Sequence, residues 1–271
     1  HTVSADAAFS ASPDAFSLRF TMPQLAMFIQ GQDLLTSGSL VIENNKADLA
    51  VDKIEWGAHR VTGIAGSFSA DDLSGLLTAD YAGEAATKQM KTHIRSVFAG
   101  VQPDDKTKSD PLSQLKHLAE QFTLNTYLSD WQFGDSSGKD EVPLSIIKEK
   151  EVTALYAGKN DDITGFLLND GVVSLKFADT LPLKFSLDGT IKKEAMDLRL
   201  TELRADIKRI WDITGLGYVI FHEGTLAGDL TISGKPLEPE FNGKLEGRGI
   251  KVNSPQYAPE IFGPVSLDII A

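Results

Sequence analysis

The sequence predicts a mainly β fold, an antiparallel-rich sheet with one apolar face and a short helical excursion. Apolar and polar residues alternate along most of the 271 residues, which is the pattern of strands with one buried and one solvated face. Asn, Asp and Gly separate the alternating stretches, as they do in turns. In the middle of the chain apolar residues recur three and four positions apart, which is the spacing of a helix face. We therefore predict a β segment over 1–84, a helical pair over 85–122 and a regular β segment over 123–271.

Short strands follow one another in the first segment. Phe16 to Met22 alternates strictly, and Asn44-Asn45 and Asp71-Asp72 are turn candidates between later strands. Pro23 to Gln32 favours a short helix with Pro at its first position. The further alternating stretches are residues 39–42, 48–52, 67–69 and 77–81.

The middle segment predicts two helices. Asp110-Pro111 supplies an N-cap followed by Pro at the first helical position, where its missing N–H costs nothing. Because an amphipathic helix needs its apolar stripe covered, we expect the pair to form a hairpin against an end or a face of the sheet. The first stripe is Ala86, Met90, Ile94, Val97 and Val101, and the second is Leu112, Leu115, Leu118, Ala119 and Phe122.

The third segment alternates most regularly. Asn169-Asp170-Gly171 predicts a tight hairpin turn in which Gly tolerates a positive φ, and Ala205 to Ile213 interrupts the strands once with a short helical or coiled stretch. We expect the apolar side chains to share one concave face, because a one-residue slip of register would turn all of them toward water. They are Val173, Leu175, Phe177, Leu183, Phe185, Leu187, Leu198, Leu200, Leu226, Leu230, Ile232, Phe241, Leu245, Ile250, Val252, Val265, Leu267 and Ile269.

Composition excludes several classes of protein. Lys and Arg number 26 against 38 Asp and Glu, and the net charge of −12 disfavours binding to nucleic acid or to an anionic membrane surface. The chain has no Cys, which excludes disulfides, thiolate nucleophiles and cysteine-ligated metals. Its longest apolar stretches are about eight residues, whereas a membrane-spanning helix needs roughly 20. Because the chain starts at His1 and stops within an alternating stretch, we expect an interior fragment of a longer protein.

No motif typical of an active site is found in the sequence. The internal histidines lie in different segments without the short spacing of a metal site, and the sequence lacks HExxH, GxSxG and GxxxxGK. Paired acids such as Asp104-Asp105 lie in polar turns, where nothing raises a carboxyl pKa. We therefore expect no catalysis, no metal and no cofactor. The histidines are His59, His93, His117 and His222.

The stretch from Ile213 to Gly247 resembles a known repeat. Gly224 to Gly234 reads Gly-x-Leu-x-Gly-x-Leu-x-Ile-x-Gly, and after a Pro-containing turn Pro239 to Leu245 reads Pro-x-Phe-x-Gly-x-Leu. Both patterns are similar to the recurring unit of the AsmA-like envelope proteins, the TamB-like members in particular.

The resemblance implies a long single-layered sheet curled into a gutter, called a β-taco, in proteins that one N-terminal helix anchors in the inner membrane. Such proteins carry phospholipid across the periplasm and contribute to outer-membrane biogenesis, and TamB-like members are linked to barrel assembly with a BamA-type partner. On that basis, the shared apolar face is a continuous hydrophobic groove that binds phospholipid acyl chains.

Other interpretations remain open. Alternation is equally typical of a β-sandwich or β-solenoid whose apolar face is a closed core. A scaffold or chaperone module could instead assist outer-membrane protein assembly by pairing nascent strands with its sheet edges. A carbohydrate-active enzyme is a third alternative.

Overall fold

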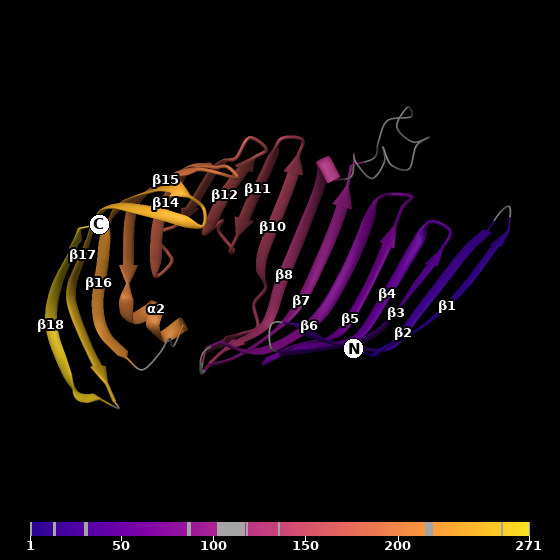
Figure 1. Ribbon diagram of the computed structural model, residues 1–271, viewed down its shortest axis with the longest axis horizontal. Helices are drawn as coiled ribbons and strands as arrows, with labels where there is room; N and C mark the ends of the chain where they lie inside the picture. The colour runs from indigo at the N-terminus through magenta and orange to yellow at the C-terminus, as the bar shows by residue number, and fades with distance from the viewer. Residues whose placement is uncertain are drawn as a thin grey trace. The chain divides into compact units, whose positions relative to one another are not determined.

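The structure is a computed structural model that describes residues 2–12, 15–29, 32–85, 88–101, 117, 119–134, 136–214, 219–255 and 257–270. Its strands pair antiparallel in a sheet that is not closed into a barrel, which confirms the mainly β prediction (Figure 1). The chain divides into two compact units. The N-terminal unit comprises residues 1–85 and 89–148, and the C-terminal unit comprises 86–88 and 149–271.

The N-terminal unit holds β1 to β10, apart from one terminal residue of β7 and one of β10. Consecutive strands pair from β1 to β6 and again from β7 to β9. The predicted turns at Asn44-Asn45 and Asp71-Asp72 are both present. The Oδ1 atom of Asp72 accepts hydrogen bonds from the backbone N–H and the hydroxyl of Ser74, which stabilises the second turn. The strands are β1 (Thr2–Ser12), β2 (Ala15–Ile29), β3 (Gln32–Glu43), β4 (Lys46–Trp56), β5 (His59–Ser69), β6 (Ser74–Ala85), β7 (Lys88–Gly100), β8 (Gln121–Phe133), β9 (Ser136–Gly138) and β10 (Val142–Glu149).

The prediction of a helix over residues 86–101 is wrong, because β7 occupies Lys88–Gly100. Met90 and Ile94 are four positions apart, and a spacing of four keeps side chains on one face of a strand as well as of a helix. Hydrogen bonding to β8 decides between the two, with Ile94 directly opposite Leu128. The short helix expected from Pro23 is also wrong, since residues 23–29 belong to β2.

Most of the second predicted helix lies outside the described residues. Within it, residues 117, 119 and 120 are helical, and β8 already begins at Gln121. Phe122, predicted as the last apolar residue of that helix, is therefore a strand residue.

The C-terminal unit is a meander in which each strand from β11 to β18 pairs with the next. The predicted turn at Asn169-Asp170-Gly171 is confirmed, with φ of 90° at Gly171. The predicted interruption near residue 207 is a helix. The elements are β11 (Val152–Ala157), β12 (Ile163–Leu168), β13 (Val172–Phe177), β14 (Leu183–Ile191), β15 (Met196–Asp206), α2 (Ile207–Thr214), β16 (Ile220–Lys235), β17 (Glu238–Ser254) and β18 (Ala258–Ile270).

Very little of this protein is buried. Its accessible surface is 17435 Å², whereas a compact monomer of 29.4 kDa exposes roughly 11,500 Å². Even two separate compact units of half that mass would expose only about 13,900 Å² together. Among the described residues no large side chain is fully buried, and the buried apolar residues are Ile64, Leu73, Ala79, Leu198, Ala205 and Ile250. Over the described residues, the apolar side chains therefore do not form the closed core of a sandwich.

Candidate functional site

The cross-strand register places the apolar residues of the C-terminal unit on a single face. Residues directly opposite each other in an antiparallel pair project to the same side of the sheet. Leu187 of β14 lies opposite Leu175 of β13 and opposite Leu200 of β15. Leu200 lies opposite Leu230 of β16 in turn. The side chains at these positions of β13, β14, β15 and β16 therefore project from the same face of the sheet.

All eighteen residues predicted to share a face do so. We call this surface, with its neighbours of the same register, the C-terminal apolar face. The described positions of this face from β12 to β17 hold no Asp, Glu, Lys or Arg. Contact of the face with lipid stays a prediction. The predicted residues are Val173, Leu175, Phe177, Leu183, Phe185, Leu187, Leu198, Leu200, Leu226, Leu230, Ile232, Phe241, Leu245, Ile250, Val252, Val265, Leu267 and Ile269.

The glycines of the repeat motif lie on this apolar face as well. Gly228 of β16 is opposite Leu245 of β17, and Gly243 of β17 is opposite Leu230 of β16. A Cβ atom built on Gly228 would lie 3.0 Å from Leu245 Cδ2 and would also meet the backbone oxygen of Lys244. Leu230 and Leu245 therefore each lie against a glycine of the neighbouring strand. The motif therefore produces an aliphatic surface. Its glycines lie at positions where a Cβ atom would meet the backbone or a leucine of the neighbouring strand.

The opposite face of the C-terminal unit is charged and internally paired. Lys184 Nζ lies 2.8 Å from Asp179 Oδ1 and 3.2 Å from Glu202 Oε2, and these carboxylates raise the pKa of Lys184. Glu246 accepts hydrogen bonds from Lys244 and Arg248, both at 2.7 Å, and the two cations lower its pKa to about 2. Such pairs keep this face solvated and leave the apolar side chains to the other face.

The N-terminal unit has an apolar face of its own, which sequence reasoning did not single out. Leu49 of β4 lies opposite both Leu40 of β3 and Gly66 of β5, and Gly66 lies opposite Leu77 of β6. Beside them is a hollow of 390 Å³ that Phe68 and other mainly apolar side chains line. The alternation of β3 to β6 was a sufficient signal for this surface, but part of its lining comes from β7, which we predicted as a helix. We call this surface the N-terminal apolar face.

Two hydrogen-bonded polar pairs interrupt the N-terminal apolar face. Ser96 Oγ and Thr126 Oγ1 are 2.9 Å apart on directly opposite positions of β7 and β8. His59 Nδ1 lies 2.7 Å from the Tyr81 hydroxyl, with the two rings stacked. In each pair the two polar atoms that face each other satisfy one another, which lowers the cost of placing them on an apolar surface.

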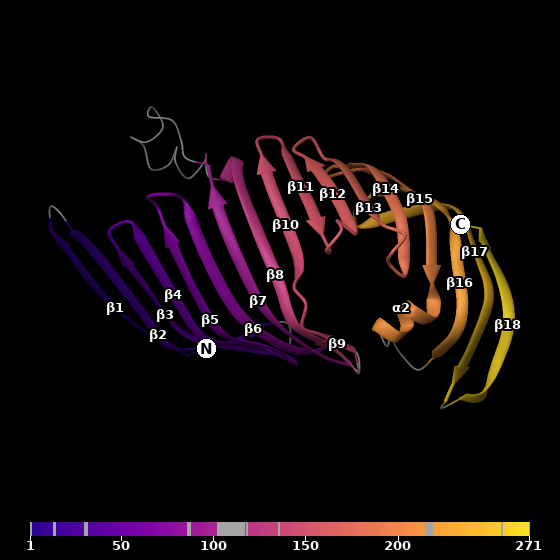
Figure 2. The same ribbon diagram turned by 180° about the vertical axis from the view of Figure 1, so that it is seen from behind.

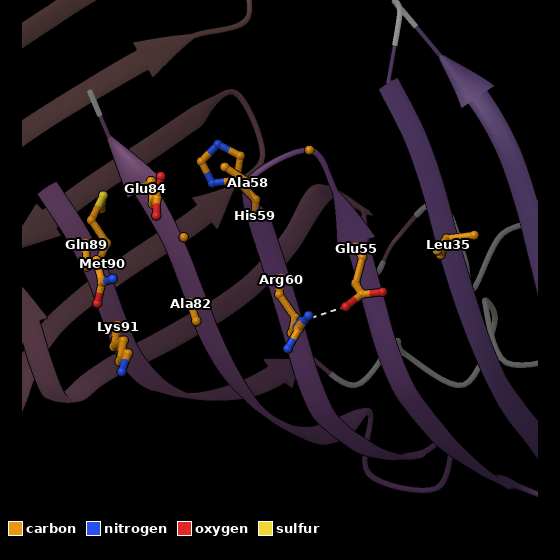
Figure 3. A pocket seen from close by; sticks show the side chains of 12 residues that line it. Leu35, Glu55, Ala58, His59, Arg60, Ala82, Glu84, Gln89, Met90 and Lys91 are labelled. Carbon is orange, nitrogen blue, oxygen red and sulfur yellow. Dashed lines mark ion pairs between the residues drawn. The ribbon is translucent and has the colours of Figure 1, made fainter. Parts of the chain in front are cut away.

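A hollow of 690 Å³ near the turn between β4 and β5 is the main candidate for chemistry (Figure 3). Arg60 Nε lies 2.6 Å from Glu55 Oε1, and Lys53 Nζ lies 2.9 Å from Glu55 Oε2. The hydrogen bond from Lys53, with support from Arg60, lowers the pKa of Glu55. A carboxylate held ionised in this way is a poor general acid near neutral pH. Glu84 and Lys91 also line this hollow, which is therefore mixed in charge.

Three of the internal histidines each have a different partner in the structure. His93 Nδ1 is 2.8 Å from Asp80 Oδ1, His222 Nε2 is 2.9 Å from Asn253 Oδ1, and His59 contacts Tyr81. In the part of the chain that the structure describes, no three His, Asp or Glu side chains form a group able to hold a metal ion. The described helices also include none with the length and apolar character needed to cross a membrane.

No family model, curated protein or solved structure matches this chain.

Proposed function

We propose that this chain carries phospholipid by binding acyl chains along its open apolar surface. The observation that supports this most strongly is the C-terminal apolar face, whose described positions from β12 to β17 hold no charged side chain and part of which is exposed. Phe241 and Leu267 on this face expose 53% and 50% of their surface. Exposed apolar surface of this extent is costly in water and is typical of a binding surface for an apolar ligand.

The energetics of lipid transfer fit such a surface. Removing an acyl chain from water is worth about 0.8 kcal/mol per CH₂, so a free two-chain lipid faces a penalty on the order of 20 kcal/mol. A carrier must therefore offer apolar contact along the whole route. Leucine, isoleucine, valine and phenylalanine supply that contact without a charged group that would hold a headgroup at one point.

The resemblance of Gly224 to Leu245 to the AsmA-like repeat supports a cellular setting for this function. We propose that the full-length protein is anchored in the inner membrane and bridges the periplasm, and that phospholipid moves through it to the outer membrane. A barrel of the BamA type is the proposed partner there. We propose no catalytic role for the chain.

Photo-crosslinking tests the proposal directly. A photoreactive residue would be placed at Leu230, Phe241 or Leu245, and at the matched neighbours Thr231, Asn242 and Lys244 on the charged face. After incubation with vesicles of diacyl phospholipid, we expect captured lipid at the first three positions and none at the second three. Equal capture on both faces, or no capture on either, would overturn the proposal.

A further inference from the structure

Helix α2 lies on the C-terminal apolar face. The Trp211 and Phe221 rings meet edge to face with their centroids 5.8 Å apart. Phe221 is opposite Val252, so it belongs to the apolar face. A Cβ atom built on Gly224 would lie 3.4 Å from Ile207 Cδ1, which places the start of the helix directly over β16. Figures 1 and 2 show α2 on the inner side of the curved strands β15 to β17.

Two of the three buried apolar side chains described on the C-terminal apolar face lie beside this helix, and the third, Leu198, lies near the other end of β15. Ala205, at the end of β15, and Ile250, next to Gly224, expose only 7% and 8% of their surface. Farther along β17 on the same face, Phe241 exposes 53%. α2 thus covers one end of the face, whereas Phe241 on β17 lies away from the helix and is open.

The helix is built to cover this surface with one side only. Ile207, Ile210 and Trp211 are partly buried, whereas Lys208 and Asp212 are exposed and pair with each other. The Asp206 carboxylate accepts a hydrogen bond of 2.9 Å from the Arg209 backbone N–H and caps the helix. The apolar side chains of α2 contact the same surface that acyl chains would contact, so helix and lipid compete for it.

We propose that α2 is a gate that occupies the C-terminal apolar face and is displaced when an acyl chain passes. This inference rests on the proposed function, because it assigns a control point to the same surface. Partial burial of three side chains is a limited contact area, which a two-chain lipid can replace with apolar contact of its own. Displacement of the helix then exposes Phe221, Val252 and Ile250 to the lipid.

The absence of cysteine from the chain permits a direct test. Cysteines at Trp211 and Phe221 would be joined by a short thiol-reactive crosslinker that fixes the helix in place. A photoreactive residue at Val252, opposite Phe221, reports lipid beneath the helix, and one at Phe241 reports lipid on the open part of the face. Vesicles of diacyl phospholipid supply the ligand. A matched control joins cysteines at Thr231 and Asn242, which are opposite each other on the charged face.

Joining the helix to β16 is expected to reduce lipid capture at Val252 at least fivefold and to leave capture at Phe241 unchanged. The control crosslink is expected to change neither. Separately, Trp211→Ala is expected to raise capture at Val252 severalfold while the melting temperature shows that the unit stays folded. Capture at Val252 that is equal with and without the crosslink overturns the gate, as does capture at Phe241 with none at Val252 in any variant, which makes α2 a fixed cap. Absence of capture at Phe241 is the separate failure of the proposed function.

Discussion

In the N-terminal unit the apolar face carries hydrogen-bonded polar pairs, whereas from β12 to β17 the C-terminal apolar face is made of aliphatic, aromatic and small residues. Ser96 and Thr126 lie beside a hollow that Phe68, Phe98 and Leu124 line. Leucines lie against glycines on both faces, but on the C-terminal face the pairs at Leu230 and Leu245 have no such polar pair among them. An acyl chain bound as proposed would therefore meet polar pairs on the N-terminal apolar face and a uniform surface on the C-terminal one. Under the proposed function, the N-terminal face would retain a ligand and the C-terminal face would let it pass.

An aspartate placed on one of these faces is expected to lower the free energy of unfolding much more at a buried position than at an open one. Leu198 exposes only 6% of its surface, so Leu198→Asp buries an unpaired charge and should cost about 4 kcal/mol or more in the free energy of unfolding. Leu230→Asp and Leu49→Asp place the same charge where water can reach it. We expect both to fold with a cost of about 1–2 kcal/mol and to lose lipid capture nearby. Chemical denaturation and crosslinking of the same variants measure both quantities.

The Leu49→Asp and Leu230→Asp variants also compare lipid binding by the two units. If Leu49→Asp leaves lipid capture on the N-terminal face intact while Leu230→Asp abolishes it on the C-terminal face, only the C-terminal unit binds lipid. Unfolding of Leu230→Asp to the same degree as Leu198→Asp would show that the face is a closed core in solution.

A smaller effect is expected from glycine replacement. At Gly228 a Cβ atom meets the Lys244 backbone oxygen, which cannot move without disturbing the pairing of β16 and β17, and φ is 156°. Gly228→Ala should therefore destabilise the C-terminal unit by about 2–3 kcal/mol. At Gly66 the nearest atom is the mobile Leu77 Cδ1 at 3.0 Å, so Gly66→Ala should cost less than about 1 kcal/mol. Equal melting temperatures for the two variants would contradict the Leu-against-Gly packing of the C-terminal face.

The smallest effect concerns the polar pair of the N-terminal unit. Ser96→Ala leaves the partly buried Thr126 hydroxyl without its partner and should cost about 1 kcal/mol. Ser96→Ala combined with Thr126→Val removes both groups and should recover part of that loss. A double-mutant cycle by chemical denaturation measures the coupling. Zero coupling would mean that the pair contributes nothing to this face.

The sequence was sufficient to predict most of the C-terminal unit and its apolar face. Alternation around the Gly171 hairpin fixes which side chains share a side of a strand, and the structure extends that pattern through the register. The helix predicted near Met90 failed because a spacing of four fits both periods, and pairing with β8 is a long-range contact that no local pattern contains. The packing of Trp211 on Phe221 was likewise not predictable, since it depends on how α2 folds back over β16.

The pairing of each strand with its neighbour in sequence gives the C-terminal unit the thermodynamics of a linear array. From β11 to β18, every described ladder joins consecutive strands, so the stability of a strand depends mainly on the two strands beside it. Unfolding can then spread from one strand to the next without crossing a common core. Evolution can also lengthen or shorten such an array by whole hairpins, because inserting two strands preserves the direction of every later strand and the side on which its apolar residues lie.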